Sequence, residues 1–73
     1  MKLTLKQIVN LWEKLGDIPT NNNDKITETF KTPISEFKKG TSRLDIWHWF
    51  DEQLECNAPE YSINDLMFHK IKV

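Results

Sequence analysis

The stretch Ile46-Trp47-His48-Trp49-Phe50 places three large aromatic rings within four consecutive positions of a 73-residue chain. Side chains share a helix face only when they are three or four residues apart, so one face cannot collect all of these rings. A helix built on this stretch is therefore buried on nearly all sides, or it leaves one ring outside the core. The division of these rings between core and surface decides how the chain folds and where it could bind.

The residues around this stretch predict a helix over 42–55. Thr41 or Ser42 is placed to cap it, and Asp45 in the first turn complements the helix dipole. Asn57-Ala58-Pro59 ends it. At about 100° per residue, five apolar side chains form one continuous arc, which we interpret as the core face. These are Leu44, Ile46, Trp47, Phe50 and Leu54.

Trp49 is the ring left over by this division. It lies about 60° around the helix from the nearest core residue, whereas His48, Glu52 and Glu55 fall on the polar side. Two interpretations stay open. Either the chain's own loop at 30–40 covers Trp49, or Trp49 is an exposed anchor for a partner, since tryptophan often dominates the energetics of interfaces.

Two further helices are expected. Thr4 and Gln7 have the spacing of a capping box before helix 5–15, and Gly16 follows that helix in the position of a C′ glycine. A serine and an aspartate repeat the capping spacing before a shorter helix at 63–69. Both helices carry apolar residues at helical spacing, which indicates that each buries one face.

Residues 17–37 predict a short, irregular β-hairpin. Three asparagines and an aspartate favour a turn, and the strand-like residues 26–30 are expected to pair with the region around Ile18. A proline at the end of this segment prevents it from being a long central strand. Ile34 and Phe37 are expected to hold the remaining polar loop against the helices.

Taken together, the pattern predicts an α+β fold, mainly α, in one small domain over residues 1–73. Residues 70–73 either add an edge strand or stay irregular. A single cysteine, Cys56, excludes an internal disulfide and is expected to be a half-buried thiol. No signal-peptide pattern or long apolar span is present in the sequence, which favours a cytoplasmic protein with no membrane partner.

The net charge of −1 is unevenly distributed along the chain. The segment 44–60 contains five acidic residues and no lysine or arginine. Such a surface repels a phosphate backbone and favours a partner protein with a basic surface, although a simply solvated helix face is the alternative. The acidic residues are Asp45, Asp51, Glu52, Glu55 and Glu60.

The sequence does not predict an enzyme, a cofactor or a metal site. Cys56 lies eight residues after His48, about 12 Å along a helix, so the two cannot form a nucleophile–base pair. His48 and Glu52 are one turn apart, but two ligands without a second pair do not define a metal site. Two glycines in the whole chain exclude a glycine-rich phosphate loop.

A nucleic-acid-binding role is a weaker hypothesis. Lys38, Lys39 and Arg43 form a small basic patch near the start of the 42–55 helix, where phosphate groups often bind. Three positive charges would give only weak, salt-sensitive affinity, and the helix that follows is acidic. Nucleic acid is therefore an unlikely partner on charge alone.

Several motifs follow one another along the chain. They are Trp12-Glu13-Lys14-Leu15-Gly16-Asp17-Ile18-Pro19, then Gly40-Thr41, then Ile46-Trp47-His48-Trp49-Phe50-Asp51-Glu52, and finally Leu66-Met67. In this order they resemble a group of small uncharacterised proteins from bacteria, prophages and phages, with the pattern W-x-K-L-x-[DE]-I-P, G-T, I-W-[HY]-W-F-[DE]-[DE] and L-M. The resemblance implies a shared fold and a mobile-element setting, but no activity. Members usually have Phe-Pro-x-Gly-Thr where this chain has Phe37-Lys38-Lys39-Gly40-Thr41, without the proline.

The leading hypothesis is a non-enzymatic protein-interaction module, in the form of a phage or prophage accessory protein that binds and modulates a host protein through the second helix. Trp49 is the expected anchor, with His48, Asp45, Glu52 and Glu55 around it. The alternative is a weak nucleic-acid-binding domain that uses the basic patch. A homodimer is also compatible with the sequence, because a domain this small gains from additional buried area.

Overall fold

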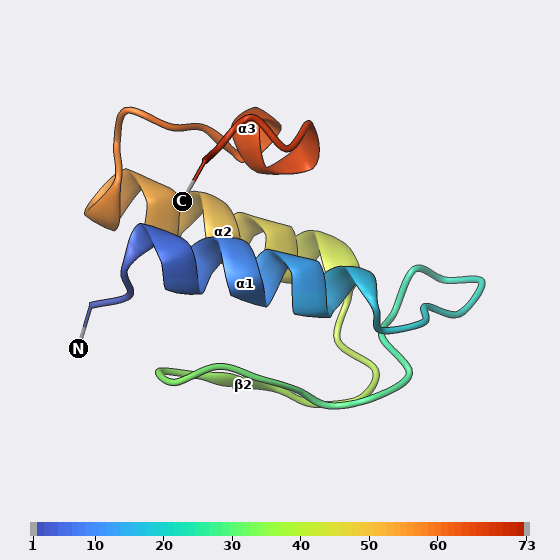
Figure 1. The fold of residues 1–73 in the computed structure, drawn as a ribbon. Coiled ribbons are helices and arrows are strands. Elements are labelled where there is room, and N and C mark those ends of the chain that lie inside the picture. The colour runs from blue at the N-terminus through green and yellow to red at the C-terminus, as the bar shows by residue number, and fades with distance from the viewer. Residues whose placement is uncertain (1, 73) are drawn as a thin grey trace.

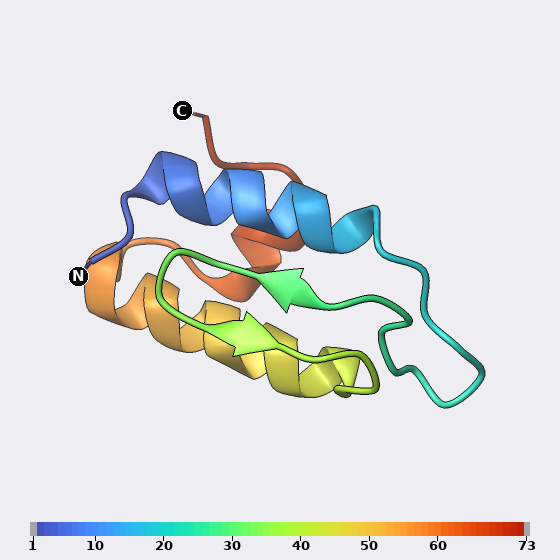
Figure 2. The ribbon, with the colours of Figure 1, turned by 90° about the horizontal axis from the view of Figure 1, so that it is seen from below.

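The computed structural model describes residues 2–72 and contains three helices and a two-stranded antiparallel sheet. In chain order the elements are α1 (Leu5–Gly16), β1 (Phe30–Lys31), β2 (Glu36–Phe37), α2 (Arg43–Asn57) and α3 (Ile63–Met67). α1 and α2 run antiparallel, side by side, as the middle layer (Figure 1). The hairpin lies against one face of this pair and α3 lies on the opposite face (Figure 2). The prediction of an α+β fold, mainly α, is confirmed.

The first helix begins as its sequence predicts and ends differently. The Thr4 hydroxyl accepts a hydrogen bond from the Gln7 backbone at 3.2 Å, and the Gln7 side chain accepts one from the Thr4 backbone at 2.8 Å. Gly16 is the last helical residue rather than a left-handed C′ residue, and Asp17 caps the helix in the right-handed region. The backbone N–H groups of Asp17 and Ile18 tighten the last turn, so its carbonyls are satisfied without a left-handed glycine.

The second helix begins one residue later and ends two residues later than the predicted 42–55. Ser42 is the N-cap residue, but its side chain makes no capping hydrogen bond. The hydroxyl of Thr41 instead donates to the backbone carbonyl of Lys38 at 2.7 Å, which closes the turn before the helix. Gly40 adopts a φ of 95° in the same turn.

The predicted core face of α2 is correct in its middle and wrong at one end. Ile46, Phe50 and Leu54 are fully buried, and Trp47 is partly buried. Leu44, however, is 55% exposed. On the helical wheel Leu44 lies within about 40° of His48 and of two acidic residues, so it belongs to the polar margin rather than to the centre of the apolar arc.

The hairpin lies within the predicted segment, but its pairing differs from the prediction. The paired residues are Phe30 with Phe37 and Lys31 with Glu36. The expected pairing of the Ile18 region with 26–30 is reduced to a single bridge between Thr20 and Ile26. Two side-chain turns explain the difference, because an asparagine closes the loop at 21–25 and a threonine closes the hairpin turn at 32–35.

The two expected anchors of the hairpin behave differently. Phe37 is partly buried and stacks on the buried Phe30, with ring centroids 6.1 Å apart. Ile34 lies in the turn between the strands and is 36% exposed, so its expected role as an anchor is wrong.

Aromatic rings connect the hairpin to both helices of the middle layer. Trp12 of α1 lies 5.8 Å from Trp47 and 5.3 Å from Phe50, measured between ring centroids. Phe50 also lies 6.2 Å from Phe30 of the hairpin. The residues with the most completely buried large side chains are Phe50, Ile8, Ile26, Ile46 and Leu54.

The third helix is shorter than the predicted 63–69. The expected capping box is present, since Asp65 accepts the Ser62 backbone N–H at 2.8 Å. The helix ends at Met67, and His69 then adopts a left-handed φ of 54° that turns the chain back toward α1. Residues 70–72 form no regular element, although Ile71 is buried, and the expectation for Val73 lies outside the described residues.

Candidate functional site

Trp49 projects from α2 toward the hairpin. Its ring centroid lies 5.5 Å from that of Phe37 and 5.0 Å from that of Phe50, edge to face in both cases. The residue is partly buried and packs against the core cluster. Of the two interpretations of Trp49, coverage by the chain's own segment 30–40 is therefore the one that this geometry supports.

The polar side of α2 is an acidic surface. Its four carboxylate residues are all exposed, and so is His48. No lysine or arginine follows Arg43 on this helix, so no basic side chain of α2 offsets these charges. We refer to this surface as the acidic face, which consists of Asp45, Asp51, Glu52 and Glu55.

A groove runs beside the acidic face, between α2 and α3. It has a volume of about 170 Å³ and is lined mainly by apolar side chains. Met67 is 38% exposed there, and Phe68, the next residue along the chain, is 65% exposed with the Lys70 ammonium 5.9 Å from its ring centroid. The residues that line this α2–α3 groove are Leu44, Trp47, His48, Asp51, Ile63 and Met67.

Of these six lining residues, only His48 was among the interaction residues expected from the sequence. Leu44 and Trp47 were assigned to the core, and Asp51 was noted only as part of the acidic segment. Helical spacing does carry a signal for Leu44, because His48 follows it by four residues and Asp51 by seven. No pattern within α2 could show that Ile63 of α3 would form the other wall.

The basic patch is not assembled as a free cluster. Arg43 pairs with Asp24 at 3.0 Å between Nη2 and Oδ1, and its guanidinium carbon lies 5.3 Å from the Trp47 ring centroid. Its backbone N–H also donates to the Asp24 carbonyl at 2.9 Å. Only Lys38 and Lys39 remain as exposed cations without such contacts among the patch residues. Arg43 therefore serves the local structure rather than an extended phosphate-binding surface.

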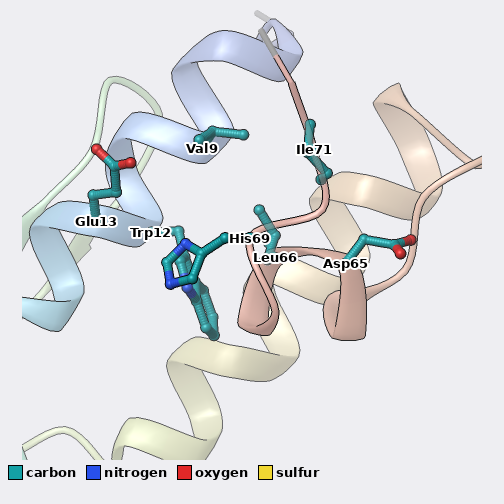
Figure 3. Close-up of a pocket in the computed structure, with 7 residues that line it drawn as sticks. All are labelled: Val9, Trp12, Glu13, Asp65, Leu66, His69 and Ile71. Atoms are coloured by element: carbon teal, nitrogen blue, oxygen red, sulfur yellow. The ribbon is translucent and has the colours of Figure 1, made fainter.

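A second, smaller cavity of about 100 Å³ lies between α1 and the C-terminal segment. Figure 3 shows the His69 ring beside Trp12, with Val9, Leu66 and Ile71 around the cavity and the carboxylates of Glu13 and Asp65 at its margin. The lining includes no serine, threonine, cysteine or lysine that could act as a nucleophile. Cys56 is exposed on α2, not half-buried as expected.

Within residues 2–72, no three or more His, Cys, Asp or Glu side chains gather in a way that could hold a metal ion. No helix of this part of the chain is both long enough and apolar enough to cross a membrane. Compared with models of known protein families, with curated proteins and with solved structures, the chain shows no significant match. The candidate site is therefore defined by its own geometry.

Proposed function

We propose that the protein is a non-enzymatic protein-interaction module that binds a basic protein surface through the outer face of α2. The observation that carries this proposal is the exposed Leu44, which lies beside the acidic face and lines the α2–α3 groove. An exposed apolar side chain with a charged rim is a common arrangement at protein interfaces. Trp49, which is partly buried and meets Phe37 edge to face, lies at the opposite edge of the acidic face from Leu44 and serves as support for the hairpin rather than as the anchor.

Charge selects the kind of partner. A second copy of the chain would place one acidic face against another, which is unfavourable because like charges across an interface repel. A surface rich in lysine and arginine is instead attracted to this face, and it associates faster at low ionic strength. The proposed partner is therefore a different protein with a basic surface.

The resemblance to small phage and prophage proteins extends this proposal to a biological setting. In that setting the module is an accessory protein in the host cytoplasm that modulates one host protein by binding it. The support for this step is the order of the sequence motifs, several of which lie on or beside α2.

The experiment is affinity capture from a host lysate with the wild-type chain and four variants. Leu44→Ser removes the exposed apolar side chain, and Ile34→Ser is its matched control on the hairpin turn. Asp51→Lys reverses a charge at the groove, and Glu28→Lys is the matched control in the loop before β1. We expect one protein to be retained by the wild type and both controls and to be lost with the two α2 variants. Equal retention by Leu44→Ser and the wild type contradicts the proposal.

A further inference from the structure

We propose that the α2–α3 groove is a receptor for a single arginine side chain of the partner. This inference rests on the proposed function and names the group that the partner inserts. The groove offers two features to an occupant, apolar side chains and one carboxylate, Asp51; His48 also lines it, and no lysine or arginine does. A long side chain with an apolar stem and a cationic end matches both features, since such side chains lay their stems on apolar surface and keep the charge at a polar edge.

The groove is large enough to hold one side chain. A cavity of about 150 Å³ lined by apolar residues is large enough to hold a benzene molecule. At about 170 Å³, the groove has room for a group of similar size. The rest of the partner would lie on the acidic face outside.

The arrangement of Trp47 and Asp51 favours arginine over lysine. The two residues are four apart on α2, so their side chains are neighbours, with Cβ atoms about 6 Å apart. A guanidinium group can stack on an indole ring and donate two parallel hydrogen bonds to a carboxylate, whereas an ammonium group offers only a point charge. Trp47 and Asp51 both line the groove.

The chain already uses this chemistry at the same ring. Arg43 lies 5.3 Å from the Trp47 ring centroid and pairs with Asp24, which is a guanidinium held between an indole and a carboxylate. Arg43 lines the small cavity that faces Leu15 and Gly16 of α1 and does not line the α2–α3 groove. Trp47 therefore lines both an occupied guanidinium position and the groove.

The walls of the groove can adapt to an occupant. Leu44 and Met67 are both substantially exposed, so they can move without disturbing the buried core. Methionine in particular is flexible and fits irregular surfaces. Ile63, which is partly buried, provides the fixed part of the α3 wall.

The test is a titration followed by amide chemical shifts of the whole chain, with three small probes. They are the Nα-acetyl amides of arginine, lysine and citrulline, where citrulline has nearly the shape of arginine but no charge. We expect the arginine probe to shift the amides of Leu44, Asp51, Ile63 and Met67, and to bind more tightly than the other two. The Asp51→Asn variant should weaken the arginine probe about fivefold, toward the affinity of citrulline, while Glu28→Gln leaves it unchanged.

Several results overturn the inference. If the arginine and citrulline probes bind with equal affinity, the groove does not distinguish a charged group from a neutral one. If the lysine probe binds as tightly as the arginine probe or more tightly, the planar guanidinium has no role in recognition. Shifts spread over the acidic face without Ile63 and Met67 show general attraction rather than a groove, and no shift with any probe shows that the groove takes no such side chain. The capture experiment is independent of this titration. If Leu44→Ser loses the partner but the arginine probe does not bind, the proposed function stands and the arginine site does not. If the arginine probe binds but capture does not depend on α2, only the arginine site stands.

Discussion

The rings of Trp49 and Phe37 meet edge to face, with centroids 5.5 Å apart and planes inclined by 76°. This contact joins α2 to the last residue of β2. A hairpin with only two paired residues on each strand is marginal by itself, so it depends on such contacts for its position. Trp49, the ring that the helical wheel leaves outside the core face, thus helps to hold the hairpin against α2.

The first prediction concerns this support. Trp49→Ala should lower the free energy of unfolding by about 2–3 kcal/mol, less than a fully buried tryptophan because part of the indole is in solvent. Trp49→Phe should lose less than half as much, since a smaller ring can still reach Phe37. Urea unfolding monitored by circular dichroism measures both values. If Trp49→Ala lowers the free energy of unfolding by less than about 0.5 kcal/mol, Trp49 does not support the hairpin and is instead free to act as an anchor for a partner.

The second prediction compares two leucines of the same helix. Leu54→Ala should lower the free energy of unfolding by about 2–5 kcal/mol, because its side chain is fully buried in the core. Leu44→Ala should change it by no more than about 0.5 kcal/mol, because 55% of that residue is already exposed. Thermal and urea unfolding of the two variants measure both changes in the free energy of unfolding. Similar losses for both leucines would show that the groove is closed in solution and Leu44 is core.

Helical periodicity predicted the buried centre of α2, and the spacing of capping residues predicted the capping boxes of α1 and α3. Each of these features depends on residues that are close together in one helix. Periodicity did not predict which edge of the α2 arc is covered. That outcome depends on the short α3 packing on one side of α2, so that Leu44 lies at a groove instead of under another element. The hairpin register failed for a similar reason, since side-chain turns at Asn21 and Thr32 set it, not the alternation of apolar residues.

The third prediction concerns the ion pair that fixes the start of α2. Asp24→Asn keeps the left-handed backbone conformation of this residue, at φ 60°, which asparagine tolerates well. It removes only the charge that pairs with Arg43, and both side chains are partly exposed. We expect a loss of about 0.5 kcal/mol at low salt, shrinking toward zero at about 1 M NaCl.

A double-mutant cycle separates this pair from the stacking of Arg43 on Trp47. Arg43→Gln should be more destabilising than Asp24→Asn, because it removes both the pair and the contact with the ring. The coupling between the two substitutions, measured by urea unfolding, should be about 0.5 kcal/mol. A coupling of zero would show that Arg43 is held by Trp47 and by the backbone alone.

The fourth prediction compares the only two glycines of the chain. A Cβ atom would meet nothing within 4 Å at either position, so packing does not distinguish them. Their backbones do, because Gly16 is the last residue of α1 and Gly40 has a φ of 95°, where residues with a Cβ are strained. Gly16→Ala should therefore raise the free energy of unfolding by about 0.5–1 kcal/mol, through better helix propensity and a less flexible unfolded chain. Gly40→Ala should lower it by about 1–2 kcal/mol. Urea unfolding of the two variants gives opposite signs if the turn before α2 is as described, whereas a neutral Gly40→Ala would require a different backbone there.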